Sequence, residues 1–210
     1  MLQITVVPVT EFQQNCSIVY DDQSKAAVVV DPGGEVDKIA AAVAELGVNV
    51  QAIWLTHGHL DHAGGAEAAK QEFGVDIIGS HIADKILLDN IEMTAAGYGL
   101  TGMRNATPDR WLEEGDSVKV GEHEFEVLHC PGHAPGHVIF VNHANKFILM
   151  GDVLFQGSIG RTDLPGGNHQ QLLDSITEKI LTLEDDYQFV CGHSAPSTVG
   201  AERQSNPFLQ

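Results

Sequence analysis

Residues 56–62 have the sequence THGHLDH, which places three histidines and one aspartate within six consecutive positions. The segment directly follows an apolar run at residues 52–55. Neutral imidazole and carboxylate groups are ligands for zinc, iron and manganese, and gathering four of them without a metal ion would carry a large desolvation cost. The segment is therefore predicted to bind metal through four side chains: His57, His59, Asp61 and His62.

Three further candidate ligands each stand just after a predicted strand: His133 after residues 124–129, Asp152 after 147–150 and His193 after 187–190. Residues just past strand ends lie along one edge of a sheet, and neighbouring glycines allow the backbone to turn tightly there. Taken alone, each of these residues could be an ordinary turn or surface residue. Their common placement favours a metal site over a surface loop that is by chance rich in histidine.

Seven ligands are too many for one tetrahedral ion and suit two ions. We expect His57, His59 and His133 to bind one ion, Asp61, His62 and His193 to bind the other, and Asp152 to bridge them. Two cations about 3.5–4 Å apart share a water and lower its pKa to about 7, which provides a hydrolytic nucleophile. Asp61 is also predicted to be catalytic, because it can orient this nucleophile by accepting its hydrogen bond.

Hydrophobic periodicity predicts the elements that position these residues. Strands are expected at residues 2–9, 16–20, 26–30, 50–55, 75–78, 118–120, 124–128, 138–142, 147–150 and 187–190, and helices at 35–46, 63–73, 81–98 and 169–183. The tail up to residue 210 is expected to be irregular or a short helix. Hairpins mixed with helices indicate two packed sheets with helices outside, rather than an all-parallel sheet.

Composition limits the classes of protein and partner. The chain has 210 residues, 43% of them hydrophobic, and we expect residues 1–210 to form a single domain. A net charge of −18 with only 11 lysines and arginines argues against nucleic-acid binding and against anionic membranes. Three scattered cysteines do not form a disulfide framework, and the N-terminus resembles neither a signal peptide nor a membrane span. A cytoplasmic location is expected.

Four segments resemble the metallo-β-lactamase superfamily, whose signature is HxHxDH followed by later histidine, aspartate and histidine ligands: THGHLDH, PGHAPGH at 131–137, GDVLF at 151–155 and CGH at 191–193. The resemblance implies an α/β (α+β) fold, a four-layer αββα sandwich, with two divalent metal ions at one edge. Zinc is the expected metal, with iron or manganese as alternatives. Within the superfamily the chain looks most like the glyoxalase II group, which hydrolyses S-D-lactoylglutathione to D-lactate and glutathione.

The resemblance to the glyoxalase II group also implies a substrate contact and a partner. Arg161, in the segment GDVLFQGSIGRTDLPGG, takes the basic position that meets the glutathione carboxylate. The expected partner is therefore a small glutathione-linked thioester. The chain ends about 17 residues after His193, as in the short bacterial YcbL-like members, which lack the C-terminal helical glutathione-binding domain. This departure predicts looser selectivity for glutathione.

Two other functions stay open at this point. A glutathione persulfide dioxygenase of the same superfamily shares the HxHxDH motif and would use a single iron held by His57, His133 and Asp152. Imidazole and carboxylate ligands suit both zinc and ferrous iron, so ligand identity does not separate the two enzymes. A metal-binding protein without catalysis is disfavoured, since the ligand set is complete. The sequence does not fix the oligomeric state.

Several residues near the predicted ligands have two interpretations. Asp31, in VVVDPGG, either holds the second nitrogen of a ligand histidine or forms a turn. His137 is interpreted as structural, because the surrounding prolines and glycines forbid a regular helix. Cys130 and Cys191 are interpreted as small buried fillers. Tyr98 lies in a glycine-rich stretch that forms either a lid over the metals or part of the core.

Overall fold

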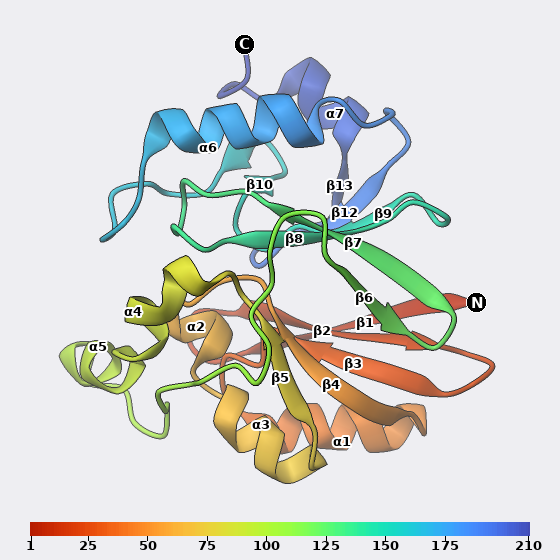
Figure 1. Cartoon of the computed structure of the whole chain (residues 1–210), viewed down its shortest axis with the longest axis vertical. Helices are drawn as coiled ribbons and strands as arrows, with labels where there is room; N and C mark the ends of the chain where they lie inside the picture. Colours follow the sequence, from red (N-terminus) through yellow and green to blue (C-terminus); the bar gives the residue numbers. More distant parts are fainter.

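The computed structural model describes all 210 residues and contains two β-sheets that pack face to face, with helices on both outer faces (Figure 1). This is the four-layer αββα sandwich, so the predicted fold class is confirmed. None of the helices combines the length and the apolar content needed to cross a lipid bilayer.

The first sheet is built from the N-terminal part of the chain and has five strands in the order β1-β2-β3-β4-β5. These are β1 (Leu2–Val9), β2 (Gln14–Asp21), β3 (Ala26–Val30), β4 (Asn49–Leu55) and β5 (Asp76–Gly79). Strands β3, β4 and β5 run parallel, because helices α1 (Val36–Leu46) and α3 (Ala66–Phe73) connect them. Both helices cover the outer face of the sheet (Figure 1).

The second sheet has six strands in the order β13-β12-β9-β8-β7-β6. These are β6 (Ser117–Val120), β7 (His123–His129), β8 (Val138–Asn142), β9 (Phe147–Leu149), β12 (Gln188–Val190) and β13 (Ser197–Thr198). Its outer face is covered by α6 (His169–Ser175), which continues as the π-helical segment η2 (Ile176–Ile180), and by α7 (Val199–Ser205) (Figure 1). A separate small hairpin joins β10 (Leu154–Phe155) to β11 (Ser158–Ile159).

The core between the two sheets is centred on aromatic side chains. Trp54 of β4 stacks on Phe140 of β8, with ring centroids 5.0 Å apart, and meets Phe125 of β7 edge to face at 5.4 Å. All three side chains are fully buried. Such aromatic contacts add to the free energy gained by burying apolar area. They fix the two sheets against each other and therefore fix the spacing of the loops at the sandwich edge.

The ligand-bearing strands belong to both sheets, which corrects the expectation that they line one edge of a single sheet. β4 ends in the first sheet, whereas β7, β9 and β12 end in the second. β9 pairs parallel with β12 and runs in the same direction as β7, because β7 and β9 are both antiparallel to β8. Their C-terminal ends therefore lie along one edge of the second sheet, facing the loop that follows β4.

Two predicted helices begin or break differently from expectation. The helix predicted at 63–73 starts only at Ala66, because Gly64 and Gly65 separate it from the single turn α2 (Leu60–Ala63). The segment predicted as one helix at 81–98 forms three pieces: the 3-10 turn η1 (Ile82–Asp84), α4 (Lys85–Leu88) and α5 (Ile91–Gly97). The break follows from a tertiary contact, since the Leu88 carbonyl accepts a hydrogen bond from the Ala106 N–H at 3.2 Å.

Candidate metal centre

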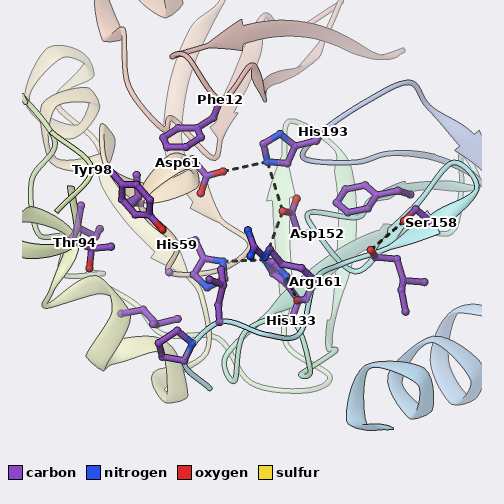
Figure 2. A pocket seen from close by; sticks show the side chains of 18 residues that line it. Phe12, His59, Asp61, Thr94, Tyr98, His133, Asp152, Ser158, Arg161 and His193 are labelled. Atoms are coloured by element: carbon purple, nitrogen blue, oxygen red, sulfur yellow. Dashed lines mark hydrogen bonds and ion pairs between the residues drawn. The ribbon is translucent and has the colours of Figure 1, made fainter. Parts of the chain in front are cut away.

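All seven predicted ligands lie close together at the edge of the sandwich, and the close-up in Figure 2 shows five of them around the floor of a pocket. Six of them form two groups, each with ligand atoms within 4.8 Å of one another: His57, His59 and His133, and Asp61, His62 and His193. In the first group, His59 Nδ1 lies 2.9 Å from His133 Nε2. In the second group, His193 Nε2 lies 3.1 Å from Asp61 Oδ2.

Asp152 lies between the two groups. Its Oδ1 is 3.4 Å from His62 Nε2 in the second group. Its Oδ2 is 3.6 Å from His133 Nε2 in the first group and 3.6 Å from His193 Nε2 in the second. One carboxylate therefore reaches ligands of both groups, which is the position that a bridging ligand needs. Coordination by these seven residues stays a prediction.

Buried partners orient the ligand histidines. Asp31 Oδ2 lies 2.9 Å from His62 Nδ1, and the same carboxylate accepts hydrogen bonds from the Thr56 hydroxyl at 2.6 Å and the Thr56 N–H at 2.7 Å. The structure thus agrees with the interpretation that Asp31 holds the second nitrogen of a predicted ligand histidine. His133 Nδ1 donates to the Arg161 carbonyl at 2.7 Å. In both histidines Nδ1 is engaged, so Nε2 is left for a metal.

His137 contacts Asp152, the aspartate predicted to bridge the two ions. Its ring is fully buried, stacks on His57 with centroids 4.6 Å apart, and accepts at Nε2 a hydrogen bond from the Asp152 N–H at 3.0 Å. Burial lowers the pKa of His137 well below its usual value, so the ring is neutral and can accept this bond. The structural interpretation of His137 is confirmed, with the added detail that the ring fixes the backbone of Asp152.

Charge is distributed unequally between the two ligand groups. Burial lowers the pKa of His57 well below its usual value and that of His59 to about 3, which keeps both imidazoles neutral and able to ligate. Burial alone would also lower the pKa of His62, but the carboxylates of Asp152 and Asp61 raise it well above the usual value. The two carboxylates therefore create a place where positive charge is stabilised.

The residues present fit a metal centre. His57 Nε2, His62 Nε2 and Asp152 Oδ1 are buried atoms without a hydrogen-bond partner. Such atoms are rare in folded proteins because each one costs free energy. A divalent cation bound by imidazole nitrogen and carboxylate oxygen would satisfy all three.

A cavity of about 710 Å³ opens directly onto the ligands. Apolar residues from the β1–β2 turn and from α4 and α5 form one wall: Phe12, Leu87 and Ile91, with Thr94 and Tyr98 beside them. Phe12 and Tyr98 contact each other edge to face, with ring centroids 6.4 Å apart. Figure 2 shows Phe12, Tyr98 and Thr94 on one side of the ligands and Ser158 on the other. Tyr98 is 64% exposed, so it covers the pocket instead of packing in the core.

Arg161 also lines the pocket, but its guanidinium is already paired. Its Nε and one terminal nitrogen donate to the two carboxylate oxygens of Asp163 at 2.8 and 2.7 Å. The predicted contact of Arg161 with a substrate carboxylate therefore requires that it exchange Asp163 for the substrate, and it stays a prediction.

Sequence reasoning missed one buried residue that touches two ligand loops, Asp84. Its carboxylate accepts hydrogen bonds from the backbone N–H groups of Gly58 and Gly136. No sequence pattern near residue 84 points to this contact, because the partners lie 26 and 52 residues away along the chain. The three cysteines, in contrast, are buried and unpaired, as the interpretation of Cys130 and Cys191 as fillers requires.

The chain is similar to known proteins in sequence and in fold. The sequence profile of the metallo-beta-lactamase superfamily matches residues 9–193. The chain is 47% identical over 209 residues to hydroxyacylglutathione hydrolase GloC of Haemophilus influenzae, covering 99% of this chain and 98% of that one. The crystal structure of BLEG-1 B3 metallo-beta-lactamase superposes with a TM-score of 0.90 at 35% identity and covers 99% of both chains.

A second solved structure, that of TTHA1623 in a di-iron-bound form, superposes with a TM-score of 0.88 at 34% identity. The match covers 98% of this chain and 100% of that one. Sequence profile, near full-length relatives and fold all indicate the same superfamily. The chain therefore belongs to the metallo-β-lactamase superfamily.

Proposed function

We propose that this protein is a thioester hydrolase that depends on two divalent metal ions and converts S-D-lactoylglutathione, or a related hydroxyacylglutathione, to D-lactate and glutathione. The observation that carries the proposal is the pair of ligand groups with Asp152 between them at the floor of an open pocket. The 47% identity to hydroxyacylglutathione hydrolase GloC along nearly the whole chain supports this substrate class.

The ions, when bound, would lower the pKa of a shared water and polarise the carbonyl of the substrate. The protein supplies the orientation of the reacting groups. Asp61, which lies at the junction of the pocket and the second ligand group, accepts a hydrogen bond from the attacking water and aims it at the carbonyl carbon. The leaving group is a thiolate with a pKa near ~8.5, so the pocket needs no dedicated proton donor at sulfur.

The two sides of the pocket suggest how the substrate is held. Arg161 is the one arginine or lysine among the lining residues, so the carboxylates of glutathione are placed on its side. The ion pair between Arg161 and Asp163 is exposed, and exposed ion pairs contribute little to stability. A substrate carboxylate can therefore replace Asp163. The apolar wall with Phe12 and Tyr98 excludes water from the acyl group.

Zinc is the proposed metal, and iron and manganese fit the same donors. The similarity to TTHA1623, solved in a di-iron-bound form, supports iron as the main alternative. The ligand set does not separate a two-metal hydrolase from a single-iron persulfide dioxygenase, because both share the HxHxDH motif that contains Asp61 and His62. The 47% identity to hydroxyacylglutathione hydrolase GloC favours hydrolysis over persulfide oxidation.

The test measures hydrolysis of S-D-lactoylglutathione by protein loaded with zinc, iron or manganese and analysed for metal content. We expect two ions per chain, turnover by the wild type, and a loss of at least about 100-fold in kcat/KM for H59A, which removes a ligand of the first group. Undiminished activity in H59A would contradict the proposal. One iron per chain together with oxygen consumption on glutathione persulfide would assign the alternative activity instead.

A further inference from the structure

Asp84 is a fully buried carboxylate at the end of η1, outside the ligand set. Its Oδ2 accepts a hydrogen bond from the Gly58 N–H at 2.8 Å. Its Oδ1 accepts one from the Gly136 N–H at 2.5 Å. Each oxygen thus holds the backbone of a different loop.

Both glycines lie inside the ligand motifs. Gly58 stands between His57 and His59 in THGHLDH, and Gly136 belongs to PGHAPGH, which supplies His133. These three histidines are the first ligand group. One carboxylate therefore joins the two loops that must meet for this group to form.

The backbone of η1 fits tightly against both loops. A Cβ atom on Gly136 would lie 2.6 Å from Asp84 N and 2.7 Å from Asp84 Cγ, and one on Gly58 would lie 3.2 Å from Asp84 Cβ. The His81 N–H also donates to the Gly136 carbonyl at 3.0 Å. A side chain at position 136 would push Asp84 away, so the contact explains why glycine stands there.

Burial destabilises the ionised form of Asp84 in the folded protein. It raises the pKa of Asp84 to about 6, even though the hydrogen bonds from Gly136 and Gly58 act in the opposite direction. At neutral pH the group is ionised, and a charged acceptor binds N–H groups more strongly than a neutral one. The two hydrogen bonds from the Gly58 and Gly136 N–H groups offset part of the desolvation cost of the buried carboxylate.

We propose that Asp84 is a positioning residue for the metal centre, which sets the separation of the two loops so that His57, His59 and His133 converge on one cation. The inference rests on the proposed metal-dependent function. The distance that Asp84 is proposed to maintain is the one between His59 Nδ1 and His133 Nε2, which is 2.9 Å and spans the two loops. A shift of either loop would open this distance and weaken the cation site.

The test compares D84N with D89N. Asparagine keeps the shape of Asp84 but offers one acceptor oxygen instead of two, so one glycine N–H loses its partner. Asp89 is the matched control, because it lies in the same segment but is exposed and pairs only with Lys85. Zinc affinity is measured by chelator competition, the ligand geometry by the visible absorption spectrum of cobalt-loaded protein, and folding by thermal unfolding of metal-free protein.

We expect D84N to lose roughly 10- to 100-fold in zinc affinity and to change the cobalt spectrum, whereas D89N matches the wild type. A purely structural role would change the unfolding temperature and leave the cobalt spectrum as it is. Wild-type affinity and spectrum in D84N would overturn the inference about Asp84 and leave the proposed function untouched. A wild type that binds no metal would overturn the proposed function and the inference with it. If D84N does not fold, D84S, which also keeps one acceptor oxygen, carries the same expectation.

Discussion

Each histidine has two ring nitrogens, and the partner of one decides which is free to bind a metal. For His62 the partner is Asp31, whose Oδ2 lies 2.9 Å from Nδ1 and leaves Nε2 free to bind a metal. We predict that D31A lowers the metal affinity of the second ligand group by roughly 10- to 100-fold, since the ring loses its fixed orientation. Chelator competition measures the effect. D37A is the control, because Asp37 is exposed on α1; equal affinities in both variants would contradict the prediction.

The ionisation of Asp84 predicts a pH dependence of stability. Burial raises its pKa from 3.8 to about 6. The folded state thus holds the proton more tightly than the unfolded state, so the associated stability is full below pH 3.8 and is lost as the pH rises through about 6. A shift of this size corresponds to roughly 3 kcal/mol.

Metal-free wild type and D84N provide the comparison, because asparagine does not titrate and the other groups cancel. The free energy of unfolding of the wild type should fall relative to that of D84N by roughly 2 kcal/mol between pH 4 and pH 7, because part of the change already lies below pH 4. Urea denaturation at a series of pH values measures this difference. A difference that stays constant with pH would show that the carboxyl titrates alike in both states.

At the scale of elements, one wall of the pocket is formed by the β1–β2 turn together with α4 and α5. Tyr98, which follows α5, meets Phe12 of the β1–β2 turn. We predict that Y98A raises KM for the thioester by about 3- to 10-fold, in line with the loss of one aromatic contact, and leaves the free energy of unfolding nearly unchanged because the ring is exposed. Steady-state kinetics check this. F208A removes another exposed aromatic outside the pocket and should have no effect on KM.

The elements also show how far sequence reasoning reaches. The strands that precede the ligands were predictable, because continuous apolar runs such as residues 52–55 form buried strand segments. The break of the predicted helix at 81–98 was not, because it depends on Ala106 donating to the Leu88 carbonyl. The contacts of Asp84 could not be predicted either, because its partners lie 26 and 52 residues away along the chain. Position after a predicted strand revealed ligands in four separate segments, whereas the contacts of Asp84 with Gly58 and Gly136 emerge only from tertiary packing.

At the scale of the whole molecule, charge governs the approach of the substrate. The net charge is −18, and a glutathione thioester is an anion, so the long-range interaction is repulsive. We predict that kcat/KM for S-D-lactoylglutathione rises as salt increases from about 20 to about 200 mM, because the Debye length shortens. A thioester without net charge serves as control and should show no such rise. A decrease with salt would show that local attraction by Arg161 outweighs the overall field.

The division of the ligands between the two sheets has a mechanical consequence. The segment 57–62 follows a strand of the first sheet, whereas His133, Asp152 and His193 follow strands of the second. Bound cations would thus cross-link the two halves of the sandwich, and neither half alone could hold them. Because a ligand that binds only the native state adds RT ln(1 + [L]/Kd) to the free energy of unfolding, metal binding should stabilise the sandwich against separation of its two sheets. Metal supply would then set the protein's lifetime against proteases as well as its activity.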